Sequence, residues 1–144
     1  SGANPQDRAY ERSIAQRIAD SPLQARATVT GYVDGDLKTA ILEAASLFVL
    51  PSYYENFGIA VAEAMLAGVP VMISDQVHIW QDIQNSQSGW ICECNQASVT
   101  ETLREALAAE QQQRGQTAIA FAKANYSWPA IAEQAIAAYH RLLA

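Results

Sequence analysis

Two glutamates, Glu55 and Glu63, stand out because they border or interrupt an apolar segment. Glu55 lies in a polar loop just before this segment, and Glu63 lies inside it. An ionised carboxylate in apolar surroundings needs a partner, so Glu63 is expected to face a polar cleft. Carboxylates accept hydrogen bonds from hydroxyl groups well, which makes both residues candidates for binding a sugar. A structural ion pair at Glu63 and an ordinary loop position for Glu55 are equally compatible with these residues alone.

A strand, a loop, a helix and a second strand position the two glutamates. An apolar run from Leu47 to Leu50 stops at Pro51, a helix is expected from Gly58 to Ala67, and a strand follows from Val69 to Ile73. In an open parallel sheet, ligands bind at the carboxyl ends of the strands, where loops meet helix N-termini. The free amides of such a terminus suit a phosphate group, and Gly58 lets a ligand approach the backbone.

The positions of Glu63 and Glu55 relative to the helix N-terminus suggest a different binding role for each. At about 1.5 Å per residue, Glu63 lies roughly 7 Å from the helix N-terminus, which suits a ribose whose diphosphate is bound at that terminus. Glu55 would point to the other side of the diphosphate, where a transferred sugar would lie.

The rest of the chain alternates between helix and strand, which predicts an α/β, Rossmann-like parallel sheet with flanking helices in a single partial domain, residues 1–144. Tyr10 to Ile18 is expected to be a helix, Thr28 to Val33 a strand, and Ser98 with Glu101 a capping box. The last helix, residues 127–144, is expected to begin at Ser127 and to bury a stripe. The stripe residues are Ile131, Ala135, Tyr139 and Leu142.

Composition excludes several classes of protein. The net charge is −6, and the nine Lys and Arg residues are scattered, so nucleic acid is not an expected partner. No apolar stretch is long enough to span a membrane, and no signal segment opens the chain, which favours a cytoplasmic protein. Cys92 and Cys94 are too close for an ordinary disulfide and too few for a zinc site, so reduced thiols are expected.

The spacing of the glutamates matches a family signature. Glu55, seven residues and Glu63 form the E-x7-E pattern of retaining glycosyltransferases with the GT-B fold, and the chain resembles their family four in particular. Further blocks resemble that family in the same order. They are Gly31 to Val33, Ala44 to Ser52, Glu63 to Val71, Ser74-Asp75 with Ile79 to Ile83, and Gly89 to Ile91. This ordered set is more specific than the glutamate pair alone.

The resemblance implies a role for each matching residue. Glu55 would be the catalytic residue and would contact hydroxyls of the transferred sugar, while Glu63 would bind the ribose. The other implied donor-binding residues are Asn56, Phe57, Gly58 and Ile59 around the sugar and diphosphate, and Gly31, Tyr32 and Val33 near the base. A nucleotide-sugar would be the donor substrate, a hydroxyl compound the acceptor, and no cofactor or metal is implied. An epimerase or glucan phosphorylase of the same fold, and a non-enzymatic binding module, are the alternatives.

Asp34-Gly35-Asp36 has a metal-binding interpretation in another glycosyltransferase fold, where two carboxylates hold a divalent ion on the donor diphosphate. Here Asp36 is better explained as the cap of a helix beginning at Leu37, after a turn at Asp34-Gly35. No metal site is therefore expected.

The start of the chain predicts an incomplete sheet. In the family that the chain resembles, two further strands and a loop with a basic pair come first, and Ser1-Gly2 resembles the end of the second strand. An acceptor domain of the same enzyme would precede them. We therefore expect a fragment that lacks its first two strands, is inactive by itself, and forms a homo-oligomer or rearranges its sheet to cover unpaired edges.

Overall fold

The computed structural model describes residues 7–143 of the chain, so the strand end predicted at Ser1-Gly2 lies outside the described residues. The chain divides into two compact units, Ser1–Ala40 and Ile41–Ala144. Each unit is described by itself. The boundary falls inside helix α2, Gly35–Ala44.

The first unit contains helix α1, Arg8–Ala19, and a short 3-10 helix, Gln24–Arg26. The carboxylate of Asp7 caps α1 by accepting the N–H of Tyr10 at 2.9 Å, which confirms the helix predicted around Tyr10 to Ile18. Asp36, predicted as a cap, instead lies in the first turn of α2, because that helix already begins at Gly35.

The strand predicted from Thr28 to Val33 is wrong. Residues 27–34 are neither helix nor strand, and Gly31 takes the left-handed region at φ +66°, which interrupts extended backbone. A strand forms only where a neighbour accepts its ladder hydrogen bonds, and every strand among residues 7–143 belongs to the second unit. The alternation of side chains alone was therefore not enough to predict a strand here.

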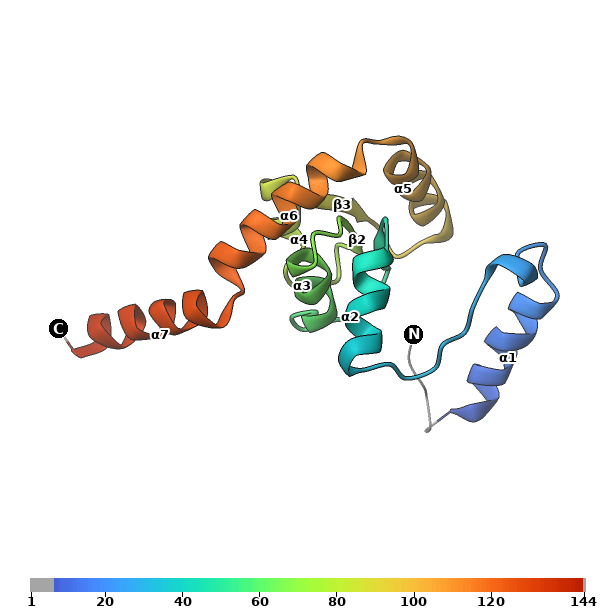
Figure 1. Cartoon of the computed structure of the whole chain (residues 1–144), viewed down its shortest axis with the longest axis horizontal. Helices are drawn as coiled ribbons and strands as arrows, with labels where there is room; N and C mark the ends of the chain where they lie inside the picture. The colour runs from blue at the N-terminus through green and yellow to red at the C-terminus, as the bar shows by residue number, and fades with distance from the viewer. Residues whose placement is uncertain (1–6, 144) are drawn as a thin grey trace. The chain divides into compact units, whose positions relative to one another are not determined.

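The second unit is built on a parallel sheet of three strands in the order β1-β2-β3. Phe48 lies opposite Val71, and Val71 lies opposite Gly89. Each strand is connected to the next by a helix, so the sheet confirms the predicted α/β, Rossmann-like arrangement (Figure 1). The strands are β1 Phe48–Leu50, β2 Val71–Ser74 and β3 Gly89–Cys92.

Five helices follow or connect these strands. They are α3 Ile59–Leu66, α4 Trp80–Ser86, α5 Gln96–Ala108, α6 Gln111–Asn125 and α7 Trp128–Leu143. The capping box predicted at Ser98 and Glu101 is wrong, because α5 begins two residues before Ser98 and is capped by Asn95, whose side chain accepts the N–H of Ser98 at 2.9 Å. The Ser98 hydroxyl accepts the N–H of Glu93 instead.

Helices cover both faces of the sheet, which explains why all four residues of β2 are buried. Val71 and Ile73 point to the face covered by α3, α4 and α6, where Met65, Ile83 and Ala118 are also buried. A second group of buried apolar residues lies on the opposite face of the sheet, under α5. It consists of Met72, Trp90, Cys92 and Ala106, with Leu47, Val99, Leu103 and Ala109 around it.

The last helix differs from its prediction. Its start is correct, because the Ser127 hydroxyl accepts the N–H of Ala130 at 3.4 Å. The predicted stripe is not buried, however, and no residue of α7 from Trp128 to Leu143 is buried among the described residues. Its amphipathic sequence predicted a partner surface, and residues 41–143 leave its large apolar side chains exposed.

Helix α6 approaches the end of α3 closely. A Cβ placed on Gly115 of α6 would lie 2.2 Å from the carbonyl oxygen of Gly68, the residue that follows the last turn of α3. Only glycine allows this contact between a helix and the main chain. The contact fixes the carboxyl end of α3 against α6, and α3 is the helix that carries Glu63.

Gly115→Ala should destabilise the protein although alanine normally favours helices. The clash with the Gly68 carbonyl outweighs a helix-propensity gain of about 1 kcal/mol, and we expect the free energy of unfolding to fall by about 1–3 kcal/mol. Gln116→Ala, at the exposed neighbouring position, is the control and should change it by less than about 0.5 kcal/mol. Urea denaturation measures both, and a Gly115→Ala variant as stable as the wild type would contradict the contact.

Candidate functional site

The N-terminus of α3 faces the loop that carries Glu55. Gly58 caps the helix in the left-handed region, with φ +80° and ψ 59°. The first intrahelical bond runs from the N–H of Val61 to the carbonyl of Gly58 at 2.8 Å, so the amides of Ile59 and Ala60 come before the helical ladder begins. These amides and the helix dipole form a region that favours an anion.

Gly58 is confined on three sides. A Cβ at this position would lie 3.0 Å from Cγ2 of Val61, 3.3 Å from Cγ1 of Val77 and 3.5 Å from Cγ of Glu55. Val77 belongs to the loop after β2 and is fully buried. The turn into α3 is therefore packed directly against the next loop of the sheet edge, as well as against its own helix.

Main-chain hydrogen bonds hold the two loops together. Glu55 forms a parallel bridge with Val77: its N–H donates to the carbonyl of Gln76 at 3.3 Å, and its carbonyl accepts the N–H of His78 at 3.0 Å. Upstream, the carbonyl of Ser52 accepts the hydroxyl of Ser74 and the thiol of Cys94. The loop after β1 is thus attached to the ends of β2 and β3 before it reaches α3.

The Glu55 carboxylate lies at the helix N-terminus. Its Oε1 accepts the N–H of Gly58 at 3.2 Å, and the side chain is half-buried. A carboxylate can accept about four hydrogen bonds, so the same group retains capacity for a ligand hydroxyl. Asn56 and Phe57, between Glu55 and Gly58, are exposed.

Glu63 shares the outer face of α3 with Ile59, since residues four apart lie above one another on a helix. Ile59 is 68% exposed, and Glu63 is half-buried. The inner face of the helix is formed by Val61, Ala64 and Met65, all fully buried. Glu63 therefore projects on the same side as the first helical residue, about 6 Å further along the axis.

The structure brings Glu55, Gly58, Ile59 and Glu63 together around one helix N-terminus. Amides there can bind an anionic group, and the two carboxylates can accept hydrogen bonds from hydroxyl groups. Gly31, Tyr32 and Val33, predicted to lie near a base, belong to the first unit. The residues around the α3 N-terminus all belong to the second unit.

An aromatic contact behind this loop escaped the sequence analysis. The ring of Phe57 meets the ring of Tyr126 edge-on, with centroids 5.3 Å apart, and Tyr126 meets Phe121 in the same way at 5.5 Å. The Tyr126 hydroxyl donates to Oδ2 of Asp82 at 2.7 Å. Burial and this bond to the Asp82 carboxylate raise the pKa of Tyr126 above its usual value. No spacing in the sequence relates Phe57 to Tyr126.

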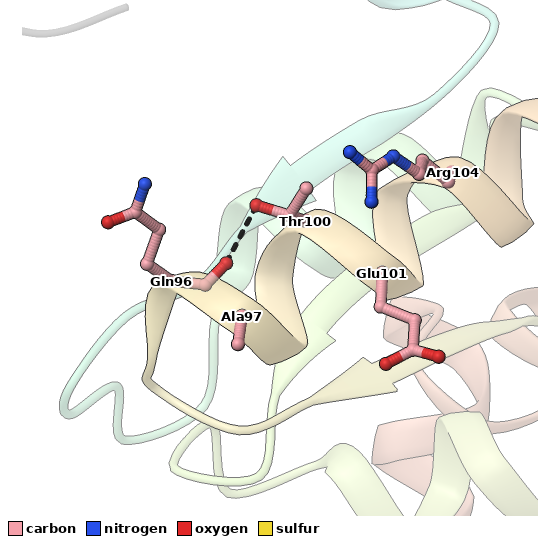
Figure 2. Close-up of a pocket in the computed structure, with 5 residues that line it drawn as sticks. All are labelled: Gln96, Ala97, Thr100, Glu101 and Arg104. Atoms are coloured by element: carbon pink, nitrogen blue, oxygen red, sulfur yellow. Dashed lines mark hydrogen bonds between the residues drawn. The ribbon is translucent and has the colours of Figure 1, made fainter.

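Two hollows lie near α5 and include none of the residues at the α3 N-terminus. One, of about 770 Å³, is lined by Gln96, Ala97, Thr100, Glu101 and Arg104 on the first turns of the helix (Figure 2). The Thr100 hydroxyl donates to the carbonyl of Gln96 there. The other, of about 300 Å³, adjoins the ends of β1 and β3. Its lining is Pro51, Tyr53, Cys94, Asn95, Gln96, Val99 and Thr100.

Both thiols are free, and each donates a hydrogen bond to a main-chain carbonyl. Cys92 is buried, which raises the pKa of its thiol, and it donates to the carbonyl of Ile73 at 3.5 Å. Within residues 7–143, no three His, Cys, Asp or Glu side chains gather as metal ligands. None of the described helices is both long and apolar enough to cross a membrane.

Comparison with known proteins agrees with this architecture. Residues 2–125 match the family described as glycosyl transferases group 1. The chain belongs to this family. A solved structure of sucrose-phosphate synthase from Thermosynechococcus elongatus resembles 99% of the chain, with a TM-score of 0.82 and 28% sequence identity. The fold is thus the α/β fold of GT-B glycosyltransferases, as the sequence predicted.

Curated relatives match different lengths of the chain. The O-antigen chain mannosyltransferase B of Escherichia coli is 31% identical over 78% of the chain, and the glycogen synthase of Mycobacterium tuberculosis is 30% identical over 71% of it. The matched part is 29% of the mannosyltransferase and 25% of the glycogen synthase. The solved sucrose-phosphate synthase is likewise covered over 37% of its length.

Gly58→Ala should destabilise the protein more than Gly68→Ala. Both glycines have φ +80°, so both substitutions introduce left-handed strain of about 1–2 kcal/mol. Only at Gly58 would the new Cβ also meet Val61 and Val77, whereas nothing lies within 4 Å of a Cβ at Gly68. Chemical denaturation should give Gly58→Ala an additional loss of about 1 kcal/mol. Equal losses would show that Gly58 is needed for its dihedral angles alone.

Tyr126 should ionise at a higher pH than an ordinary tyrosine. Because its folded-state pKa is raised, its contribution to stability is fully present below about pH 10 and is lost as the pH rises through the folded-state value. Titration by phenolate absorbance should show a late step that disappears in Tyr126→Phe. The step should persist in the control variant Tyr32→Phe, in which the Tyr126 hydroxyl and its bond to Asp82 remain. A late step that survives Tyr126→Phe would refute the assignment.

Proposed function

We propose that this chain is the donor-binding part of a retaining glycosyltransferase that moves a sugar from a nucleotide diphosphate to a hydroxyl acceptor. One observation carries the proposal: the Glu55 carboxylate lies at the N-terminus of α3, Glu63 lies about one turn further along the same helix, and the first amides of that terminus precede the helical ladder. The membership of the glycosyl transferases group 1 family supports the same activity.

Each part of a nucleotide-sugar has a complementary group at this terminus. The diphosphate binds the amides around Gly58 and Ile59, where the helix dipole favours negative charge. Glu63, about one turn further along, accepts hydroxyls of the ribose. Glu55, with Asn56 and Phe57 beside it, accepts hydroxyls of the sugar that is transferred. Gly31, Tyr32 and Val33 of the first unit remain the proposed vicinity of the base.

The reaction places negative charge on the departing diphosphate, and dipoles or cations must stabilise it. The α3 N-terminus supplies dipoles. Among the basic side chains of the second unit, Arg114 is engaged at the opposite end of the sheet, where it donates to the carbonyls of Gln87 and Gly89 and lies 4.3 Å over the ring of Trp90. We propose that the cations for the leaving group come from elsewhere in the enzyme, and we propose no metal ion at the site.

Binding rather than turnover is the activity expected of these 144 residues by themselves. The matched relatives are several times longer than the part they share with this chain. We propose that an acceptor domain of the same enzyme provides the second substrate. Retention of configuration rests on the E-x7-E spacing of Glu55 and Glu63.

Two substitutions should separate sugar binding from nucleotide binding. Glu63→Gln should weaken both nucleoside diphosphates and nucleotide-sugars by about tenfold or more, because a hydrogen bond to a charged acceptor is lost. Glu55→Gln should weaken nucleotide-sugars by a similar factor and leave nucleoside diphosphates nearly unchanged. Calorimetric titration with uridine, guanosine and adenosine diphosphates and their glucose and mannose conjugates measures both effects.

Glu101→Gln is the matched control, because Glu101 is an exposed glutamate on α5 away from the α3 terminus. It should bind all donors like the wild type, and added EDTA should change nothing. No binding by the wild type to any donor, or equal binding by all variants, would refute the proposed site and favour a non-enzymatic assembly module.

A further inference from the structure

Tyr126 lies outside the part of the chain that matches the family, which ends at residue 125, and outside the residues assigned to the donor. It is the residue that ends α6, where its N–H donates to the carbonyl of Ala122 at 2.8 Å. Its side chain nevertheless reaches the loop between β1 and α3, where it meets Phe57. A residue far along the chain is thus in contact with the residue directly before Gly58.

Tyr126 is fixed by more than one contact. Phe121, one turn earlier on α6, packs edge-on against its ring, and Asp82 of α4 accepts its hydroxyl hydrogen. Phe57 is different, because it is 39% exposed and belongs to no helix or strand. In this pair the tyrosine is the restrained partner and the phenylalanine is the one whose position depends on the contact.

These contacts form a continuous ring of interactions around the N-terminus of α3. Glu55 bonds through its main chain to Gln76 and His78, and the loop containing them leads directly into α4. Asp82 of α4 bonds Tyr126, and Tyr126 packs on Phe57, two residues after Glu55. The loop after β1 and the loop after β2 are therefore connected in two ways, by main-chain hydrogen bonds and through the side chain of Tyr126.

We propose that Tyr126 is a positioning residue, which holds Phe57 and the loop after β2 so that Glu55 and the α3 amides are preorganised for the donor. This inference rests on the proposed function for its consequence in binding. Preorganisation raises affinity because a loop already held in its bound conformation loses less conformational entropy when the ligand binds. Tyr126 would contact no part of the donor.

The test uses variants of the 144-residue chain and two independent readouts. Tyr126→Leu removes the ring and the hydroxyl, Tyr126→Phe removes only the hydroxyl, and Leu103→Ala destabilises the opposite face of the sheet without touching either loop. The first readout is affinity for uridine, guanosine and adenosine diphosphates. The second is hydrogen exchange at the amides of Glu55, Gly58 and His78, each of which donates a hydrogen bond within the two loops.

Tyr126→Leu should weaken diphosphate binding by about three- to tenfold and accelerate exchange at the three loop amides. Tyr126→Phe should recover most of the affinity, because the aromatic contact with Phe57 is retained. Leu103→Ala should lower the unfolding midpoint yet bind like the wild type. Wild-type affinity in Tyr126→Leu, or an equal loss of affinity in Leu103→Ala, would overturn the inference.

A double-mutant cycle shows whether Tyr126 acts through Phe57. If it does, Phe57→Leu combined with Tyr126→Leu should lose little more affinity than either single variant, whereas independent effects would add. Additive losses would overturn the inference. Should the wild type bind no diphosphate, the proposed function fails, while exchange at the loop amides still decides whether Tyr126 orders the loops.

Discussion

The left-handed backbone of Gly58 is the constraint on which the site depends. With φ +80° and no Cβ, this residue lets the chain pass from the bridge between Glu55 and Val77 straight into α3. A Cβ here would lie tightly against Val61 and Val77, which would have to shift to accept it. The same turn brings the Glu55 carboxylate back to the helix N-terminus, so the position of a potential ligand and that of its acceptor group follow from one backbone conformation.

The N-terminus of α3 has acidic side chains nearby. Two carboxylates lie close to amides that favour an anion, while Arg114 stabilises the other end of the sheet. A helix dipole contributes typically 0.3–1 kcal/mol at an exposed terminus, which is small beside the repulsion between carboxylates and a diphosphate. If the proposed donor binds here, most of its charge must be compensated by cations rather than by the helix dipole.

The sequence predicted the elements whose boundaries are chemically sharp. The apolar runs of β1 and β2 are bounded by Pro51 and Gly68, and the helix between them contains only one charged residue, Glu63. The strand predicted for residues 28–33 was wrong because alternating side chains indicate extended backbone but do not indicate whether a neighbouring strand is present. The cap of α5 was misplaced because Asn95 and Ser98 are both good capping residues, and the geometry of the turn at Glu93 decides between them.

Two other features were beyond any local pattern. The contact of Phe57 with Tyr126 joins residues whose spacing carries no periodicity, and it exists only because α6 crosses α3. The exposure of α7 was missed for the opposite reason, because an amphipathic helix predicts an apolar partner without specifying where that partner is. The candidate site itself could be predicted from sequence because its two glutamates lie within one strand-loop-helix unit.

The contact between Gly115 and Gly68 has a consequence for how this fold tolerates sequence change. It is made by main-chain atoms of both segments, so the depth at which α6 lies on α3 is set without any side chain. The apolar residues around it can be exchanged for others of similar volume without lifting the helix. Divergent sequences can thus keep the contact between the rings of Tyr126 and Phe57, provided that Gly68 and Gly115 remain.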